Sequence, residues 1–480
     1  MGRPQLQQLA GLLLLMFAAS LLPVLLISFS DQETRSATWA GFAATAAAAG
    51  YALWWPERRA IQRLRARDGF VVVALFWVLL SLLSALPFYA LLDVALEDAL
   101  FEAVSGFTTT GATVLAELDR MPISILYYRS QLQWLGGIGM IVSAVAILPM
   151  IGVGGMQLLR AEASGPMKDD KLTPRIGKTA QHLWGIYAGL TLVCALAYLA
   201  AGMSPFDAVC HAMSTLSTGG FSTHDASFAY FHSDAIESIA IIFMLLGSIP
   251  FTLHYMALHQ RSIAPYRRHG ETLAFLVVVI LTVALTAALV RGYDHLAGFE
   301  AWRAAAFAVV TVITSTGFMD EDFTQWPNVL PTLLIYVSCI GGCAGSTAGG
   351  IKVIRFVVLA RNCALQIERL VHPNLVRPLK HDERTVPDKV TDAVWGFFAL
   401  YVLVFVLLMT FGMIGGLDQV SAFGATATTL NNLGPGLGTT SLSFATVAPW
   451  LKVLYSFAML LGRLEFFTLL VLLHPAFWRS

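Results

Sequence analysis

Apolar stretches recur from one end of the chain to the other, with shorter polar segments between them. A bilayer core about 30 Å thick requires about 20 apolar residues in each spanning helix. Ten stretches approach that length, at residues 9–29, 38–55, 70–92, 122–151, 183–203, 236–258, 272–291, 328–361, 393–415 and 449–474. This pattern predicts an all-α polytopic membrane protein.

The composition agrees with this prediction. The chain has 480 residues, of which 57% are hydrophobic and 12% charged, whereas a soluble domain carries about 25% charged residues. The first stretch is not typical of a cleaved signal peptide, because its apolar core from Leu9 to Ile27 is long and no small-residue cleavage site precedes Ser28. We therefore expect it to remain as a membrane helix.

Basic residues gather on alternate loops. Four clusters, at 58–67, 160–178, 261–268 and 352–389, hold 23 of the 30 lysines and arginines together with Arg3 and Arg479. Cytoplasmic loops are enriched in these residues. If the ten spans alternate, both termini are predicted to be cytoplasmic, and the acidic segments 117–119 and 320–322 lie outside.

Four of the outer loops contain a short segment that suits a helix but cannot span, followed by small polar residues and a glycine. They read FEAVSGFTTTGATV (101–114), FDAVCHAMSTLSTGGFS (206–222), AAAFAVVTVITSTGF (304–318) and SAFGATATTLNNLGPG (421–436). Aligned on Gly111, Gly219, Gly317 and Gly434, they predict a fourfold internal repeat of span, half-helix, loop and span. The predicted parts are two N-terminal transmembrane helices (1–69) and repeats at 70–178, 179–270, 271–389 and 390–480.

These loops predict an ion filter. Backbone that is not helical is tolerated at membrane depth only when it is buried or lines a wet cavity, and rings of carbonyls can replace the hydration shell of potassium. The alternative is four ordinary outer loops with Ser/Thr-rich helix ends, which the fourfold register makes less favourable. The predicted potassium-binding residues are Thr109, Thr110, Gly111, Ser217, Thr218, Gly219, Ser315, Thr316, Gly317, Asn432, Leu433 and Gly434.

The run GGCAGSTAGG (341–350) interrupts the predicted span 328–361. It lacks the lysine directly after glycine that a phosphate loop needs and the G-x-S-x-G frame of a nucleophile elbow. A helix-packing face of small residues is one interpretation, and a flexible intramembrane gate is the favoured one. The predicted gate residues are Gly341, Gly342, Gly345, Ser346, Thr347, Gly349 and Gly350, together with Arg463.

Arg463 lies near the middle of the last predicted span, where a charge costs about 2.5–3.5 kcal/mol. Helical periodicity places Lys452 on the same face as Arg463 and Glu465 on another. We expect Arg463 to touch the carbonyls of the gate and to oppose ion passage; the alternative is an arginine paired for packing. His211 and His254 are expected to be ordinary hydrogen-bonded histidines.

Nearly the whole chain resembles the Trk/Ktr/HKT superfamily of potassium transporters, and within it the bacterial Trk-type membrane subunit. The resemblance rests on SGFTTTGAT (105–113), QWLGGIGMIV (133–142), STLSTGGFST (214–223), GGCAGSTAGGIKVIR (341–355), NNLGPGLG (431–438) and LLGRLEFFTLL (460–470). It implies four potassium-channel-like M1–P–M2 repeats in a pseudo-fourfold arrangement plus two extra N-terminal helices. It also implies a homodimer in the bacterial inner membrane and a cytosolic, nucleotide-binding (RCK/KTN-type, TrkA-like) regulatory subunit.

The resemblance also bears on ion choice. In plant members a serine at the first filter glycine goes with sodium transport, whereas glycine in all four loops goes with potassium. All four aligned positions here are glycine. The fourth loop departs from the Thr-Gly pattern because Leu433 precedes its glycine and Pro435 follows it, which makes the predicted ring asymmetric.

Two functions remain open from the sequence. The first is a potassium pore gated by the glycine run and by the regulatory subunit, which would dock on the basic segments 160–178 and 355–390. The second is a proton- or sodium-coupled symporter, for which Glu465 is the only clear midplane carboxylate. The five cysteines show no metal or redox spacing and are expected to be free. No catalytic constellation, bound cofactor or nucleic-acid partner is expected; potassium is the transported ion.

Overall fold

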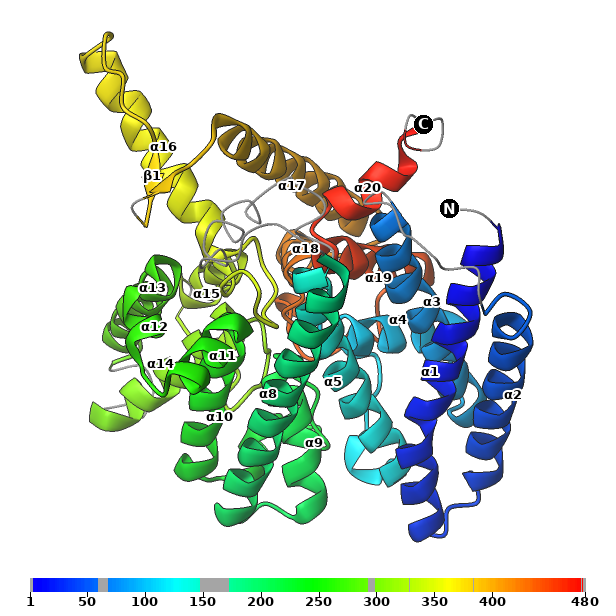
Figure 1. The fold of residues 1–480 in the computed structure, drawn as a ribbon. Coiled ribbons are helices and arrows are strands. Elements are labelled where there is room, and N and C mark those ends of the chain that lie inside the picture. Colours follow the sequence, from blue (N-terminus) through cyan, green and yellow to red (C-terminus); the bar gives the residue numbers. More distant parts are fainter. Residues whose placement is uncertain are drawn as a thin grey trace.

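The computed structural model describes residues 3–58, 68–146, 172–291, 298–327, 329–382, 384–475 and 477. Long helices run across the molecule and shorter ones fill its middle (Figure 1). The helices are α1 (Arg3–Ser30), α2 (Ser36–Trp54), α3 (Asp68–Leu91), α4 (Leu96–Phe107), α5 (Ile123–Ala146), α8 (Leu172–Ala200), α9 (Pro205–Leu216), α10 (Asp234–Gly247), α11 (Phe251–Gln260), α12 (Ala264–Arg268), α13 (Gly270–Val290), α14 (Gly298–Ile313), α15 (Val329–Ile340), α16 (Val353–Val371), α17 (Asp388–Ile414), α18 (Gln419–Asn431), α19 (Pro449–Arg463) and α20 (Phe467–Leu473). One hairpin pairs β1 (Lys380–His381) with β2 (Arg384–Thr385).

Five described helices are long and apolar enough to cross a membrane, and a sixth span results if the bent pair α10 and α11 counts as one. The five are Pro4–Ser30, Asp68–Leu91, Thr179–Ala200, Gly270–Val290 and Asp388–Ile414. This is the pattern of a multi-pass, all-α membrane protein. The prediction of ten spans is therefore met only in part within the described residues.

Broken helices explain much of the difference. The predicted span 236–258 bends by 95° between α10 and α11. The span 328–361 is interrupted between α15 and α16, and 449–474 is interrupted between α19 and α20. Glu465 and Phe466 at the last break have φ angles of 55° and 53°, outside the right-handed helical region. Arg463 consequently ends a helix, rather than lying in the middle of a continuous one as predicted.

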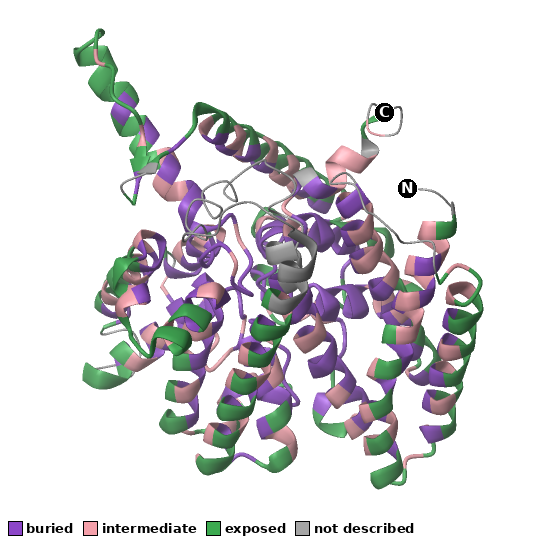
Figure 2. Cartoon of the chain, in the orientation of Figure 1, coloured by how far each residue is buried: buried purple, intermediate pink, exposed green. Residues whose placement is uncertain are grey.

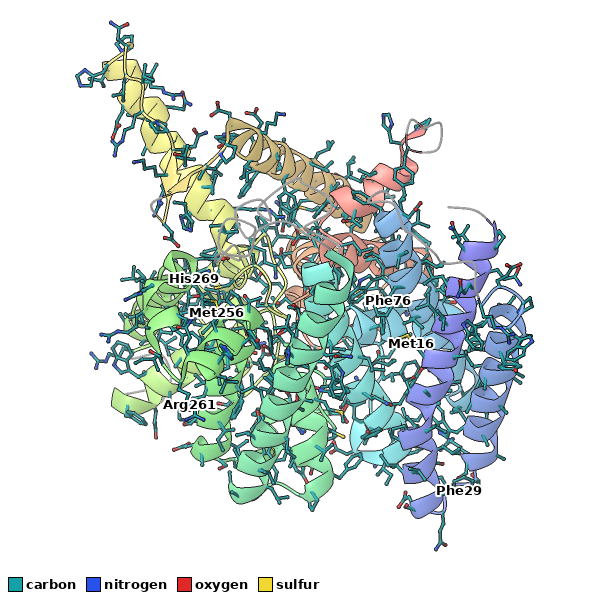
Figure 3. The ribbon with its side chains drawn as sticks, viewed as in Figure 1. Met16, Phe29, Phe76, Met256, Arg261 and His269 are labelled. Carbon is teal, nitrogen blue, oxygen red and sulfur yellow. The ribbon has the colours of Figure 1, made fainter. Side chains whose placement is uncertain are left out.

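The short helices α4, α9, α14 and α18 form the centre of the fold. Each follows a long helix and is almost wholly buried over its C-terminal half, so that the middle of the molecule is purple in Figure 2. The long helices expose apolar side chains at the periphery, such as Met16 and Phe29 of α1, which are 55% and 58% exposed (Figure 3). Such outward apolar surfaces suit contact with lipid.

The helices α1 and α2 pack against each other beside this central arrangement (Figure 1). At one end of the molecule, α16 and the β1–β2 hairpin project beyond the bundle, and the start of α1 and α20 lie at the same end. Of the predicted docking segments, 355–390 includes this projection, whereas residues 160–171 lie outside the described residues. The basic residues between 59 and 67 also lie outside them.

Candidate functional site

The four short helices end in the same backbone conformation. In each following loop, a residue with positive φ stands two positions before a glycine with positive φ. The φ angles are 54° and 83° for Thr109 and Gly111, 51° and 83° for Thr218 and Gly220, 54° and 84° for Ser315 and Gly317, and 53° and 103° for Asn432 and Gly434. We call the segments 108–114, 217–223, 314–320 and 432–437 the first to fourth ring loops.

We call Gly111, Gly220, Gly317 and Gly434 the ring glycines. Each of them faces the backbone of the following loop. A Cβ atom on Gly111 would lie 2.2 Å from the carbonyl oxygen of Gly219 in the second loop. The same atom on Gly220 would lie 1.9 Å from Thr316 O, and on Gly317 it would lie 2.0 Å from Leu433 O.

The circle closes at the fourth loop, where a Cβ atom on Gly434 would lie 3.0 Å from Thr110 O. The four loops therefore meet around one axis. Glycine is needed at the close contacts because a side chain has no room there.

The second loop corrects the register predicted from the sequence. Gly220, and not Gly219, has the conformation of Gly111 and faces the next loop. Gly219 occupies the place of Thr110, since both amides bond the carbonyl five residues earlier at 2.8 Å. The sequence STGG offers two adjacent glycines, and alignment on the Thr-Gly pair selects the first. Ser217, a predicted filter residue, consequently precedes the two residues of this loop that have positive φ, Thr218 and Gly220.

A cavity of about 450 Å³ opens on one side of the ring. All four ring glycines line it, including Gly220, whereas Gly219 does not. Carboxylates of Asp225, Asp320, Glu321 and Asp322 lie around the same cavity. Arg129 and His224 also line this cavity, but the four carboxylates outnumber them. The lining therefore favours a cation that approaches the ring from this side.

An ionic cluster beside this cavity links Asp119, which follows the first ring loop, to Asp207 and His224 on either side of the second ring loop. His224 Nδ1 lies 2.5 Å from Asp119 Oδ1, and its Nε2 lies 3.4 Å from Asp207 Oδ1. Burial opposes the charged imidazole, but the bonds with Asp207 and Asp119 outweigh it and raise the pKa of His224. The bond with His224 lowers the pKa of Asp119.

On the other side of the ring, residues 341–352 connect α15 to α16 without helical structure; we call this segment the glycine-rich loop. Gly341, Gly345 and Gly350 have φ angles of 71°, 78° and 77°. Because only glycine adopts such angles readily, the sequence of this segment breaks the span. The prediction of a broken helix at 341–350 is therefore confirmed.

The glycine-rich loop contacts the C-terminal ends of α9, α10 and α18 and the third ring loop. Thr347 Oγ1 donates to the carbonyls of Leu216 at 3.0 Å and of Gly247 at 2.9 Å. The amide of Gly349 donates to Ser315 Oγ at 2.5 Å. The amide of Gly350 donates to the carbonyl of Asn431 at 3.0 Å. The loop thus lies directly against the ring loops.

Arg463 meets this loop as the sequence predicted. Its Nη1 donates to the carbonyl of Thr347 at 2.8 Å, and the residue is 3% exposed. Its Nε and Nη2 have no hydrogen-bond partner among the described residues. Lys452, expected on the same face, instead donates to Asp98 Oδ1 at 2.5 Å and to Ala445 O at 2.9 Å. The gating role of Arg463 stays a prediction.

Further polar groups hold the glycine-rich loop. The Lys352 ammonium donates to the carbonyl of Ala348, and Glu271 Oε1 accepts from the amide of Ala344 at 2.7 Å. Glu465 forms an ion pair with Arg355. The sequence analysis counted Lys352 only among the basic residues of a cytoplasmic loop, although a charge inside the predicted apolar span 328–361 was a usable signal.

The remaining expectations concern histidines and thiols. Both ring nitrogens of His211 are hydrogen-bonded, to Asp207 O and Ser222 Oγ, as are those of His254, to Tyr266 and Leu246. Both are therefore ordinary buried histidines, as predicted. All five cysteines are free thiols. Within the described residues, no cluster of three His, Cys, Asp or Glu side chains could hold a metal ion.

Comparisons with known proteins identify the family. A family model described as a cation transport protein matches residues 35–480. The Trk system potassium uptake protein TrkH of Vibrio parahaemolyticus is 46% identical over 478 residues, covering 98% of this chain and 99% of the relative. TrkG of Escherichia coli is 38% identical over 477 residues, covering 98% of each chain.

A solved structure is similar throughout. The crystal structure of the potassium transporter TrkH from Vibrio parahaemolyticus matches with a TM-score of 0.93 and 42% identity, over 100% of both chains. The chain belongs to the family of Trk-type potassium uptake membrane subunits.

Proposed function

We propose that this chain forms a potassium-selective uptake pore in the bacterial inner membrane. The observation that carries the proposal is the closed circle in which each ring glycine faces the carbonyl of the next loop. In this proposal, the carbonyls of Thr110, Gly219, Thr316 and Leu433 replace the hydration shell of the ion. The C-terminal ends of the four short helices add a favourable field, because they carry the negative end of the helix dipole.

The four ring loops support an arrangement of four M1–P–M2 repeats around the pore. In this arrangement, the repeats occupy 70–178, 179–270, 271–389 and 390–480, and the two N-terminal helices in 1–69 stand outside. The repeated φ pattern supports the assignment, because independent loops have no reason to share it. The filter positions of the second repeat become Thr218, Gly219 and Gly220.

The glycine-rich loop serves as the gate in this proposal. It contacts the third ring loop through Gly349 and the ends of α9 and α18, just before the second and fourth ring loops, through Thr347 and Gly350. An ion that leaves the ring therefore meets it at once. Arg463 adds a positive charge at the loop. Two unit charges about 4 Å apart repel by about 4 kcal/mol at an effective dielectric constant of 20, which is enough to oppose passage until the loop moves.

Regulation would come from the cytosol. The predicted partner is a nucleotide-binding regulatory subunit, and the projecting α16 with its hairpin offers it a surface (Figure 1). Asp382 in this hairpin accepts from the amide of Gly270 at 3.0 Å. Glu271, which follows Gly270 in the chain, accepts a hydrogen bond from the amide of Ala344 in the glycine-rich loop. A homodimer, in which each chain keeps its own pore, completes the proposed assembly.

A proton- or sodium-coupled symporter is the alternative. Its only carboxylate candidate from the sequence, Glu465, is paired with Arg355. An ion pair favours the charged carboxylate, so this pairing makes Glu465 a poor site for repeated proton exchange. The passive pore is therefore the favoured mechanism.

Ion flux in proteoliposomes tests the proposal. The parent protein is expected to pass potassium down its gradient, with sodium much less permeant and with no effect of an imposed proton gradient beyond its electrical contribution. Potassium uptake that requires a proton or sodium gradient would support the symporter. Equal permeation of sodium and potassium would overturn the filter assignment.

A further inference from the structure

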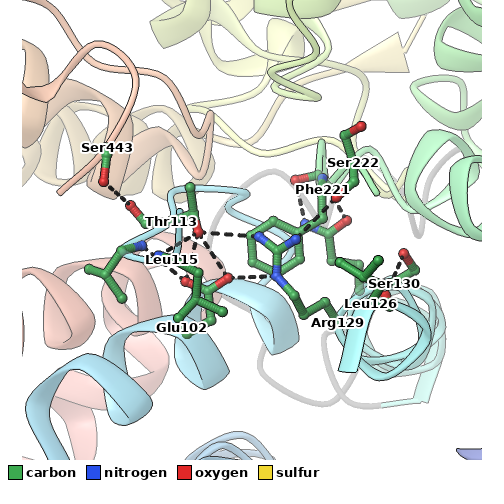
Figure 4. Close-up of polar contacts among 12 residues, drawn as sticks. Glu102, Thr113, Leu115, Leu126, Arg129, Ser130, Phe221, Ser222 and Ser443 are labelled. Atoms are coloured by element: carbon green, nitrogen blue, oxygen red, sulfur yellow. Dashed lines mark hydrogen bonds and ion pairs between the residues drawn. The ribbon is translucent and has the colours of Figure 1, made fainter. Parts of the chain in front are cut away.

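A buried arginine on α5 bridges equivalent positions of the first two ring loops (Figure 4). Arg129 Nη2 lies 3.2 Å from Thr113 Oγ1, and Nη1 donates to the carbonyl of Ser222 at 3.1 Å. Thr113 stands two residues after Gly111, and Ser222 stands two residues after Gly220. One guanidinium therefore contacts the equivalent residue of two neighbouring loops, through the side-chain hydroxyl in the first loop and the backbone carbonyl in the second.

A carboxylate keeps this guanidinium in place. Arg129 Nε donates to Glu102 Oε1 at 2.8 Å, and both side chains are at most 1% exposed. Glu102 also accepts from Thr113 Oγ1 at 2.9 Å (Figure 4). It accepts from the amide of Val114 as well, at 3.0 Å. The ring of Phe221 lies under the guanidinium, with the ring centroid 4.1 Å from Arg129 Cζ. The planar fork of arginine suits several fixed partners at once.

One helical turn along α5, Gln133 holds the second loop directly. Its Nε2 donates to the carbonyl of Gly219 at 2.6 Å, and its Oε1 accepts from the amide of Phe221 at 3.0 Å. The carbonyl of Gly219 is the one that faces Gly111 of the neighbouring first loop. Residues four apart share a helix face, so α5 presents Arg129 and Gln133 together to the second loop.

We propose that Arg129 and Gln133 are positioning residues that fix the second ring loop against the first and thereby contribute to the selectivity for potassium over sodium. The proposal rests on the function proposed above. Selectivity depends on the spacing and the field strength of the coordinating carbonyls. Gln133 affects both at Gly219, because it fixes the carbonyl oxygen and also donates a hydrogen bond to it.

The main test replaces Gln133 by methionine, which keeps the length of the side chain but removes both hydrogen bonds. We expect the permeability ratio of potassium to sodium to fall about tenfold, the factor that corresponds to a change of one hydrogen bond in ion binding. Reversal potentials under bi-ionic conditions in reconstituted bilayers measure this ratio. Gln131→Met is the matched control, since Gln131 lies on the same helix but donates to Ser20 O in α1, at 2.8 Å.

A second variant keeps the buried charge. Arg129→Lys retains a cation beside Glu102 but cannot reach Thr113 and Ser222 together, so the ratio should again fall while the protein still folds. A thermal unfolding midpoint is measured for each variant. If Gln133→Met and Arg129→Lys lower this midpoint but keep the parent ratio, both residues are only structural and the proposal is refuted. If the parent itself is not selective, the proposed function fails instead.

Discussion

Serine substitutions at the four ring glycines should change ion selectivity in a graded order. The order follows from the distance between an added Cβ atom and the carbonyl oxygen of the next loop. This distance is 1.9 Å at Gly220, 2.0 Å at Gly317, 2.2 Å at Gly111 and 3.0 Å at Gly434. Ordinary contact begins at 3.4 Å. The carbonyl oxygen opposite Gly220 must therefore move by about 1.5 Å, but the one opposite Gly434 by only about 0.4 Å.

Backbone strain does not produce this order by itself. All four glycines have positive φ, and a left-handed conformation costs an L residue about 1–2 kcal/mol. This cost is similar at the four positions, so the difference between Gly220→Ser and Gly434→Ser comes mainly from the displaced carbonyl. A change of about 1.4 kcal/mol in the free energy of potassium binding relative to sodium binding alters the permeability ratio tenfold. We expect Gly220→Ser to change the ratio by more than this factor.

Bi-ionic reversal potentials of the reconstituted variants provide the assay, with cross-linking or size-exclusion profiles to confirm that each variant is folded. Gly220→Ser should lose most of the preference for potassium, and Gly434→Ser should retain much of it. The reasoning is wrong if Gly434→Ser changes the ratio as much as Gly220→Ser, because the contact distances would then not control the filter.

The other predictions concern the gate, the regulator and the outer ionic cluster. Arg463→Ala removes a charge-assisted hydrogen bond worth about 1.5–3 kcal/mol, so basal potassium flux without the regulator should rise at least about tenfold. Removing Ala344–Ala348 should raise this flux as well. Unchanged flux in both folded variants would place the gate elsewhere. Deleting 374–386 should abolish co-purification with the regulatory subunit while the thermal unfolding midpoint of the membrane part is preserved, and normal co-purification would exclude this docking surface. Because the pKa of His224 is raised in the folded protein, its contribution to stability is complete below about pH 6.5 and is lost as the pH rises through the raised pKa. The unfolding midpoint should therefore fall in the parent as the pH rises above about 6.5, and it should fall less in His224→Asn. Equal slopes would show that His224 does not carry the effect.

The glycine-rich loop shows how the local sequence and the tertiary structure divide their roles. Its five glycines in ten residues (341–350) predict a break in the span, because glycine destabilises a helix and permits positive φ. The sequence does not say what the broken segment touches. Only the fold brings Thr347 to Leu216 and Gly350 to Asn431, contacts between residues 131 and 81 positions apart.

The sequence by itself determined the class of protein, the four polar loops, the glycine-rich break and the intramembrane arginine. These are local properties, set by apolar length, by the conformational freedom of glycine and by the cost of a buried charge. The tertiary structure alone decided that Gly220 rather than Gly219 faces the next loop. It also brought Arg129 and Gln133 to the second loop and ended α19 at Arg463. Either glycine of STGG can adopt positive φ, so the choice between them depends on the neighbouring loops and helices, which no local pattern encodes.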